Sequence, residues 1–513
     1  MGGAKSRRSS NIVKGLITLL ALMLFSFAFM YLVKVPYEGV GKGIVDSWCG
    51  VRGGCTSPLM INSRSALVEQ GVSLGFFLVV IALTAISMDY RYYAALLGVS
   101  AIVFLGVVSP QLIIGGVEWG LILFLIGAMT LAYVLRHLRV FEYLATKVLE
   151  ISGERPVLLV VLLSLLSWSL AIAVGEVTSI VYVMMLVLNI YKLTGLDIKP
   201  LAILSVLATN TGSVALPVGN PIGIYLAFTA NLSVTSFIVK ALPLSLLNLA
   251  VLVAAFTLLE RDYLSSLKAR LSRDRISKMV TSFYTSLSAK EYSHVKWGSV
   301  VLAAFLVLVG SSDYLAELIS ALGGMPVDPH SLLAFTPYPL ILVSGALFGA
   351  SKMGEALERG VEWPSVVFFI ALFMLGYSLL WSGAAFKLAY LTALAGSWGG
   401  SVSFPLLYAV MLALSASLSS VLDNLSVIVA LTPVAKAIVS IGGKAAAYWA
   451  LLYGGVFGGN YTPIGSSANI VAVGLLEKSK FKIGWSEWLK LALVATSAQI
   501  AVAAAWLLTV AAA

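Results

Sequence analysis

The sequence predicts an all-α, polytopic membrane protein. Of its 513 residues, 60% are hydrophobic and only 11% are charged, whereas a soluble domain carries about 25% charged residues. Apolar runs close to the roughly 20 residues that cross a bilayer recur along the whole chain. Backbone groups in hydrocarbon must be paired internally, so these runs are expected to be helices. We expect about 11 transmembrane helices plus two re-entrant hairpins, arranged in two inverted repeats.

Short basic stretches orient the first half, because positively charged loops stay in the cytoplasm. From a cytoplasmic N-terminus we expect helices over about 14–33, 70–88, 93–108 and 118–135, a hairpin over 157–190, and helices over 200–228 and 234–258. The hairpin is predicted to be re-entrant because basic residues flank both of its ends and no charged loop divides it. Residues 1–69 are expected to form an extra transmembrane helix and an external loop, and residues 70–258 the first repeat.

The second half follows the same order. Residues 259–296 form the longest polar stretch and are expected to be a basic cytoplasmic loop. Within the second repeat, residues 297–513, we expect helices over about 297–311, 332–350 and 362–382, a hairpin within 385–439, and helices over 445–475 and 487–511. This path gives a multi-pass protein of the cell membrane with an external C-terminus. Cys49 and Cys55 then lie outside, where either a disulfide or two free thiols fit.

The predicted inverted repeat is visible in the amino-acid sequence itself. Gly116-Val117-Glu118-Trp119 recurs as Gly360-Val361-Glu362-Trp363, and Val218-Gly219-Asn220 aligns with Ile464-Gly465-Ser466 at a shift of 246. Glu118 and Glu362 each begin a predicted helix, where a carboxylate offsets the positive helix end and the next Trp anchors at the interface. We favour this structural explanation over a transport role for the two glutamates.

Each half places two polar clusters inside apolar sequence: 175–179 and 209–221, then 422–426 and 458–469. Glu176 and Asp423 lie in the middle of the hairpins, with no Lys or Arg within helical reach. A carboxylate at membrane depth costs about 2.5–3.5 kcal/mol even on mild scales, so each is a functional candidate. Such carboxylates suit a proton or sodium site. The alternative is that one of them only caps a short helix.

The later clusters contain Gly, Pro and Asn, which break helices. Broken helices in a membrane line cavities, where free N–H groups suit anions and free carbonyls suit cations; the alternative is a packing kink. The candidate substrate and ion ligands are Glu176, Thr178, Asn210, Thr211, Gly212, Asn220, Asp423, Asn424, Ser426, Asn460, Thr462, Gly465, Ser466 and Asn469. Glu176, Asp423 and Asn424 are the candidates for a sodium ion.

The second-half motifs carry a family resemblance. Residues 422–426 (Leu-Asp-Asn-Leu-Ser), 458–469 and 361–364 (Val-Glu-Trp-Pro) resemble the ion transporter superfamily. The branch is that of arsenite permeases, related sodium/proton antiporters and the P protein, with a citrate transporter-like domain. The resemblance covers roughly residues 70–511. It implies two opposed hairpins and two broken helices around an ion site, with elevator-like movement.

The match and its departures are residue-specific. Asp423 and Asn424 match the family's hairpin Asp-Asn, whereas Gly175-Glu176 occupies the corresponding place in the first half. Asn220 stands where relatives often have Asp, and Gly223 where they often have Asn. These changes weaken any transfer of substrate identity.

The expected function is secondary active transport of a small inorganic or organic anion or oxyanion, coupled to H⁺ or Na⁺. A sodium/proton antiporter is the close alternative. An enzyme is not expected, because all three histidines fall in polar connections; a channel is disfavoured. No phosphate-binding loop is present, so ATP use would need a partner. We expect no cofactor other than the coupling ion. The expected partners are the bilayer and the transported ion, and not nucleic acid; the resemblance permits a homodimer.

Overall fold

The computed structural model describes residues 18–86, 90–323, 326–348, 351–398 and 401–512. Most of these residues are helical, which confirms the all-α class; one short antiparallel pair, β1 (Ser397–Trp398) and β2 (Ser401–Val402), accompanies the helices. By length and composition, eight described stretches qualify as membrane spans: Arg64–Thr84, Trp119–His137, Pro156–Val174, Glu176–Thr194, Val234–Leu259, Ala289–Gly310, Trp363–Ser382 and Trp485–Thr509. Shorter apolar helices, including Thr18–Leu32, add to them. The chain is a multi-pass membrane protein.

The chain folds into two compact units, and each unit takes segments from both halves of the sequence. Unit 1 comprises Met1–Glu118, Trp363–Met411 and Ser426–Leu451, and unit 2 comprises Trp119–Glu362, Leu412–Leu425 and Leu452–Ala513. Two of the boundaries divide the repeated Glu-Trp motif, between Glu118 and Trp119 and between Glu362 and Trp363. The motif thus marks the points where the chain passes from one unit to the other.

Unit 1 is built on three packed helices. Its elements are the helix Thr18–Leu32, α2 (Gly39–Val51), η1 (Pro58–Asn62), α3 (Arg64–Ile86), α4 (Arg91–Phe104), α5 (Pro110–Gly115), α21 (Trp363–Ser382), α22 (Ala384–Ala395) and parts of α23 (Phe404–Ser419), α24 (Asn424–Ser440) and α25 (Ala446–Gly458). Helices α3, α4 and α21 pack against one another. Gly98 of α4 permits the close approach, because a Cβ there would lie 3.1 Å from Val80 and 3.3 Å from Leu375.

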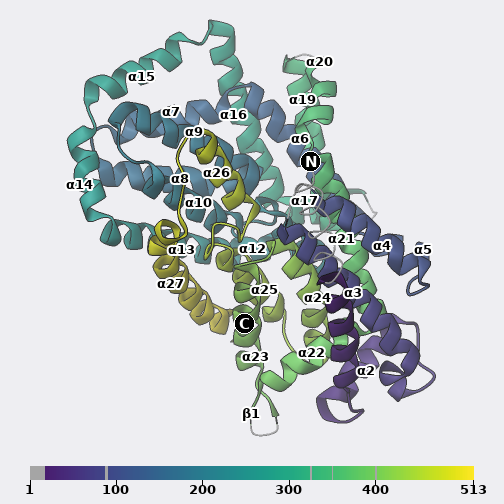
Figure 1. Cartoon of the computed structure of the whole chain (residues 1–513). Helices are drawn as coiled ribbons and strands as arrows, with labels where there is room; N and C mark the ends of the chain where they lie inside the picture. Colours follow the sequence, from purple (N-terminus) through teal and green to yellow (C-terminus); the bar gives the residue numbers. More distant parts are fainter. Residues whose placement is uncertain (1–17, 87–89, 324–325, 349–350, 399–400, 513) are drawn as a thin grey trace, which may run out of the picture. The chain divides into compact units, whose positions relative to one another are not determined.

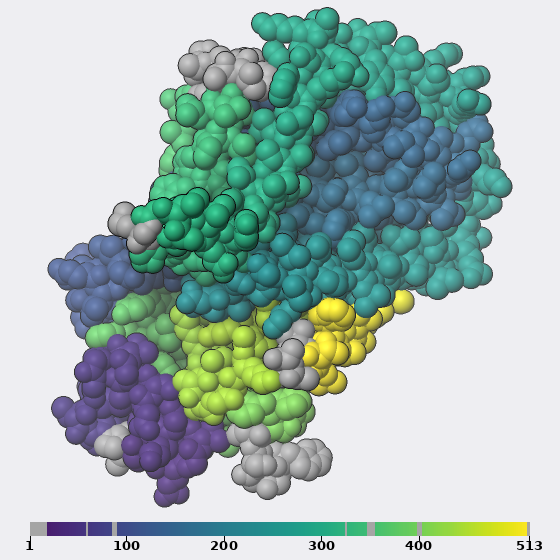
Figure 2. Space-filling view, turned by 180° about the vertical axis from the view of Figure 1, so that it is seen from behind, coloured from purple at the N-terminus to yellow at the C-terminus, as the bar shows by residue number. Residues whose placement is uncertain are grey.

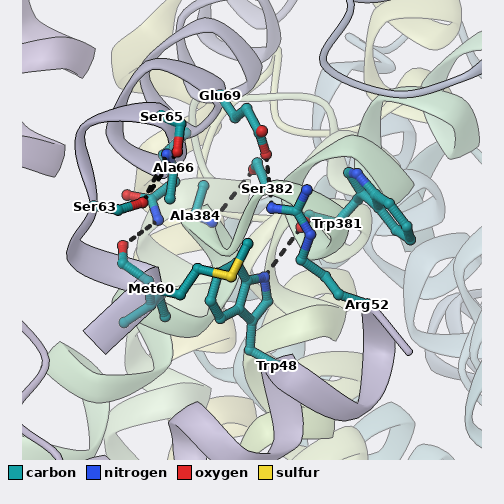
Figure 3. A network of polar contacts seen from close by, with 12 residues as sticks. Trp48, Arg52, Met60, Ser63, Ser65, Ala66, Glu69, Trp381, Ser382 and Ala384 are labelled. Atoms are coloured by element: carbon teal, nitrogen blue, oxygen red, sulfur yellow. Dashed lines mark hydrogen bonds and ion pairs between the residues drawn. The ribbon is translucent and has the colours of Figure 1, made fainter. Parts of the chain in front are cut away.

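The predicted start of the helix over 14–33 lies outside the described residues. The predicted ends of the helices over 70–88 and 332–350 also lie outside them. The segment expected to be an external loop contains the helix α2 and packs against other helices of unit 1. Cys49 and Cys55 are joined by a disulfide, so the structure contains the first of the two alternatives. The short covalent ring includes Arg52, whose guanidinium lies 5.1 Å from the Trp381 ring centre and 2.9 Å from the Glu69 carboxylate (Figure 3). These contacts attach the segment to α3 and α21.

Unit 2 contains most of the remaining helices (Figure 1). They are α6 (Trp119–His137), α7 (Val140–Ser152), α8 (Pro156–Val174), α9 (Glu176–Thr194), α10 (Lys199–Ser213), η3 (Pro217–Gly219), α11 (Pro221–Ala230), α12 (Val234–Lys240), α13 (Leu242–Leu259), α14 (Arg261–Arg270), α15 (Arg273–Thr285), α16 (Ala289–Gly310), α17 (Ser312–Gly323), α18 (Pro329–Phe335), α19 (Pro337–Phe348), α20 (Ser351–Gly360), α26 (Ser467–Lys478) and α27 (Trp485–Ala512). Helix α10 forms the core, since every residue from Leu201 to Ser213 is buried.

Both predicted hairpins are present as helix pairs. Helices α8 and α9 lie side by side and meet at Gly175, and α10 packs against both (Figure 1). Each has 19 residues, so each is long enough to span a bilayer, and the re-entrant path stays a prediction. The second pair is α23 (Phe404–Ser419) and α24 (Asn424–Ser440), which are joined by residues 420–423.

The two helices predicted over 200–228 and 445–475 are interrupted. The first divides into α10, η3 and α11, and the second into α25 (Ala446–Gly458) and α26. Proline interrupts the backbone hydrogen bonding at each break. The stretch 259–296, expected to be a loop, is also helical: α14, α15 and the start of α16 occupy it. Apolar residues at helical spacing explain this, since Leu264, Leu267 and Ile276 are buried on the inner faces of α14 and α15.

Candidate functional site

Glu176 begins α9 directly after the sharp turn of the first hairpin. Gly175 supplies that turn with a φ of +80°, a conformation that residues with a Cβ rarely adopt. The Glu176 residue is only 6% exposed. The Ser213 hydroxyl, at the end of α10, lies 3.4 Å from Glu176 Oε2, and the charge of Asp423 acts on the same carboxyl group. The structure therefore brings the two predicted acids close enough to interact, both within unit 2.

The first helix break is closed by Asn220. Its amide nitrogen donates to the Ser213 carbonyl at 3.1 Å and to the Ser213 hydroxyl at 2.8 Å. Its amide oxygen accepts from the backbone N–H of Gly223 at 2.6 Å and so caps the N-terminus of α11. Gly219 is needed for the tight approach, because a Cβ there would lie 2.5 Å from the Ser213 carbonyl oxygen.

The second break repeats this arrangement. Ser466 caps α26 by accepting from the Asn469 backbone N–H at 3.3 Å. The Asn469 amide nitrogen donates to the carbonyls of Gly459 and Thr462, each at 2.8 Å. A Cβ on Gly465 would lie 2.5 Å from the Gly459 carbonyl oxygen. The cap position and the close backbone approach match those of the first break at a shift of 246 residues, whereas the amide that donates to the equivalent carbonyl comes from Asn469 instead of the cap residue.

Side-chain amides join the two breaks inside unit 2. The Asn210 amide nitrogen donates to Asn460 Oδ1 and to Asn469 Oδ1, each at 2.8 Å. The Ser466 hydroxyl lies 2.7 Å from Asn469 Oδ1 and 3.2 Å from Asn210 Oδ1. All four residues are buried. The sequence predicts each of them as a ligand, and the structure gathers them into one cluster, which we call the amide cluster.

Two buried amides of this region are absent from the sequence-based candidates. Gln499 donates to the Thr211 hydroxyl at 2.9 Å and to the Asn248 carbonyl at 3.1 Å. Its amide oxygen lies 3.4 Å from the Asn460 amide nitrogen. Both Gln499 and Asn248 are fully buried in apolar helices, α27 and α13. Their isolated position in apolar runs is the signal that identifies them, because a buried amide needs partners.

The tip of the second hairpin lies beside the second break. Asn424 is 4% exposed; its amide oxygen accepts from the Ser419 hydroxyl, and its amide nitrogen has no partner among the residues that the structure describes. Gly459 lies next to it, since a Cβ there would be 2.7 Å from that nitrogen. The Thr462 hydroxyl donates to a carbonyl of the 420–423 connection, where Asp423 is half-buried.

The other predicted residues occupy the surroundings of this centre. Thr178 is half-buried in the first turn of α9. Gly212 allows α10 to approach α8, because a Cβ there would lie 2.3 Å from the Trp168 carbonyl oxygen. Ser426 is buried but belongs to unit 1, whereas the other candidate ligands belong to unit 2.

The donor set is rich in oxygen. Carboxylates, amide oxygens and hydroxyls are the ligands that hard cations prefer. In the described ranges, no group of three or more His, Cys, Asp or Glu side chains is placed to hold a metal ion.

A polytopic fold with broken helices at a buried polar centre is typical of secondary transporters. Residues 78–454 match the citrate transporter family (CitMHS), and the chain belongs to this family. The chain is 28% identical over 445 residues to an uncharacterized transporter of Mycobacterium bovis, covering 85% of this chain and 97% of the relative. It is 25% identical over 478 residues to an uncharacterized transporter of Synechocystis, covering 88% and 99%. It is 23% identical over 479 residues to the human P protein, covering 80% and 56%. These findings confirm the predicted superfamily, and the chain is a multi-pass membrane transporter.

Proposed function

We propose that this transporter is a secondary active permease for a small inorganic or organic anion or oxyanion, coupled to H⁺ or Na⁺. The observation that carries the proposal is the setting of Glu176. This buried carboxyl group interacts with a hydroxyl and with a second acid, Asp423, beside the helix breaks of both halves. Two nearby carboxylates repel each other, so a bound proton or cation relieves the repulsion.

The proposal gives the two acids and the amides different roles. Glu176 and Asp423 take the coupling cation, and Asn424 contributes an amide to the same hairpin tip. Asn210, Thr211, Gly212, Asn460, Thr462 and Asn469 shape the substrate site. The N-termini of α11 and α26 begin at the breaks, and their positive ends favour an anionic substrate.

A sodium/proton antiporter is the second candidate, because a pair of interacting acids also suits cation exchange. A channel and an intramembrane enzyme are less well supported. We propose elevator-type movement, a cytoplasmic N-terminus and an external C-terminus, with the basic residues of α14 and α15 on the cytoplasmic side. The proposed partners are the bilayer, the transported ion and a second copy of the chain. No cofactor other than the coupling ion is proposed.

Transport assays on the full chain in proteoliposomes test the proposal. Imposed pH or sodium gradients are combined with arsenite, dicarboxylates, citrate or no anion. Asp423→Asn and Glu176→Gln are each expected to reduce gradient-driven uptake by roughly tenfold or more, since contacts to a charged group are worth more than about 1.4 kcal/mol. Glu362→Gln is the control, because Glu362 directly precedes α21 at a unit boundary and is expected to act structurally.

Two outcomes decide between the candidates. Unaltered transport and coupling in Asp423→Asn would remove that residue from the mechanism and contradict the proposal. Sodium/proton exchange that proceeds at full rate without any anion would establish the antiporter instead. Uptake of one anion that requires the gradient would establish the permease and identify its substrate.

A further inference from the structure

The last helix of unit 2, α27, has one exposed side and one side that faces the polar centre. Leu493 and Leu508 are exposed, and Figure 2 shows yellow atoms of the C-terminal segment at the surface beside teal atoms. The helix packs against α10 and α13, and its Trp488 and Gln499 are fully buried. These two residues lie about three turns apart on the same face of the helix. Helix α27 therefore presents two polar groups to the interior of unit 2.

The side-chain amide of Gln499 contacts one residue of each broken helix. Its nitrogen donates to the Thr211 hydroxyl at 2.9 Å, in the helix that ends at the first break. Its oxygen lies 3.4 Å from the amide nitrogen of Asn460, which is part of the second break. The nitrogen also donates to the backbone carbonyl of Asn248 in α13, at 3.1 Å. Both N–H groups and the oxygen thus have partners, which together fix the amide in one orientation.

Asn460 is held at both ends of its side-chain amide. Its oxygen accepts from Asn210 at 2.8 Å, and its nitrogen faces the Gln499 oxygen. Because the two N–H groups of Gln499 are used elsewhere, Gln499 offers only an acceptor to Asn460. Asn460 must therefore turn its nitrogen toward α27 and its oxygen toward Asn210. The indole of Trp488 donates to the Asn460 carbonyl at 3.0 Å, so α27 holds the backbone of the second break as well.

The Thr211 hydroxyl is engaged on both its donor and its acceptor side. It donates to the Leu207 carbonyl at 2.7 Å and accepts from Gln499. A hydroxyl has a single hydrogen, so Thr211 has none left for an anion. The Asn460 nitrogen has two hydrogens, and Gln499 takes one of them in the described part of the chain. Thr211 is thus the anchor of Gln499, and Asn460 is the group that Gln499 orients.

We propose that Gln499 is a positioning residue that links the two breaks and orients the Asn460 amide toward the transported anion. The inference rests on the proposed function, which places Asn460 at the substrate site. Gln499 does not contact the anion itself. Its hydrogen-bond partners in the described ranges are Thr211, Asn248 and Asn460. Loss of Gln499 is therefore expected to weaken anion binding and to leave the acids that take the coupling cation in place.

Uptake kinetics in proteoliposomes made with the full chain test the inference. The probes are labelled arsenite, succinate and citrate under an imposed gradient. Gln499→Met keeps the length of the side chain but removes its N–H groups. It is expected to raise the KM for the transported probe by up to about tenfold, the equivalent of one buried hydrogen bond, with an unchanged maximal rate and gradient dependence. A merely structural role would instead lower the maximal rate, because less protein would be folded, and would leave the KM unchanged.

Thr496→Val is the matched control on the same helix. Thr496 lies one turn before Gln499 and is fully buried, and its hydroxyl has no partner among the residues that the structure describes. This variant is expected to keep the wild-type KM. Gln499→Asn keeps the amide but is one methylene shorter; the same rise in KM is expected, and it replaces Gln499→Met if that variant does not fold. A wild-type KM without Gln499, or an equal rise in the control, would overturn the inference.

A double-mutant cycle separates this inference from the proposed function. Unfolding midpoints are measured in detergent, without substrate, for Gln499→Met, Thr211→Val and the double variant. Because the two side chains share a hydrogen bond, the shift caused by Gln499→Met is expected to be smaller in the Thr211→Val background. Additive shifts would overturn the inference even in a chain that transports anions. A non-additive cycle in a wild type that takes up none of the three probes would contradict the proposed function and retain the link between the breaks.

Discussion

Replacing Asn210 by alanine tests whether the amide cluster stabilises the core of unit 2. The substitution removes a donor that serves Asn460 Oδ1 and Asn469 Oδ1, both at 2.8 Å. Asn469 Oδ1 keeps the Ser466 hydroxyl at 2.7 Å, whereas Asn460 Oδ1 loses its described donor. A buried acceptor without a partner costs about 1–3 kcal/mol, and a lost neutral hydrogen bond about 1 kcal/mol. The expected loss of stability is about 2–4 kcal/mol.

Thr209→Val is the matched control on the same helix. Thr209 is fully buried, and its hydroxyl has no partner among the described residues. Removal of an unsatisfied hydroxyl is expected to be neutral or to stabilise by up to about 1 kcal/mol. Intrinsic tryptophan fluorescence of the purified chain, followed during heating in detergent, measures both variants. Equal shifts of the two unfolding midpoints, or an unchanged midpoint for Asn210→Ala, would refute the assignment of the cluster as a stabilising network.

Two further predictions concern the break and a helix cap. Gly465→Ala places a Cβ 2.5 Å from the Gly459 carbonyl oxygen and is expected to lower the free energy of unfolding by about 1–3 kcal/mol in the same heating assay. Gly474→Ala is the control; its Cβ meets open space, and it is expected to raise the free energy of unfolding by up to about 1 kcal/mol. Equal effects of the two variants would contradict this prediction. Burial alone would raise the pKa of Asp328, but hydrogen bonds from Ser331 and its other neighbours lower it overall. The stability that Asp328 adds, about 1 kcal/mol for such a cap, is therefore present above its unfolded pKa and lost as the pH falls through its lower folded pKa. The midpoint difference between the wild type and Asp328→Ala should vanish in acid, and a constant difference would show that the carboxylate charge is unimportant.

Much of the candidate site was predictable because a carboxylate or a helix-breaking residue inside a membrane segment is costly and therefore rarely occurs there without a role. Glu176 is costly in hydrocarbon wherever the helix places it, so its sequence context alone identifies it as a candidate. The breaks at Pro217 and Pro463 were predictable from clusters of Gly, Pro and Asn, which together disfavour a continuous helix. These predictions depend on residue type and on the neighbouring residues in the chain, and both can be read from the sequence.

The parts that were missed depend on contacts between distant positions. Gln499 meets Thr211 across 288 residues and Asn248 across 251. Neither partner can be inferred from helical periodicity, which relates only residues on one helix.

The helices α14 and α15 were expected to be a loop because charge dominates their composition. Their apolar residues are few, but they recur at helical spacing and bury one face.

The two breaks use the same backbone positions with different side chains. Ser213 and Gly459 are equivalent at the shift of 246 residues, and the carbonyl of each accepts an asparagine amide. The first break supplies this amide from the cap position, Asn220. The second supplies it from Asn469, three residues beyond its cap. The missing asparagine at position 223 is therefore compensated by the one at position 220.

Because Asn220 supplies the amide in the first break and Asn469 in the second, the amide oxygens of these two residues have different partners. Asn220 Oδ1 is used at 2.6 Å to cap α11, so it is not offered to the centre of unit 2. Ser466 caps α26 in the second half, which leaves Asn469 Oδ1 to accept from Asn210. The amide cluster is thus built on the second break, although the backbone of the two breaks is equivalent. Substrate selection in this chain is accordingly expected to respond more strongly to changes at Asn469 than to changes at Asn220, whose loss acts first on the folding of α11.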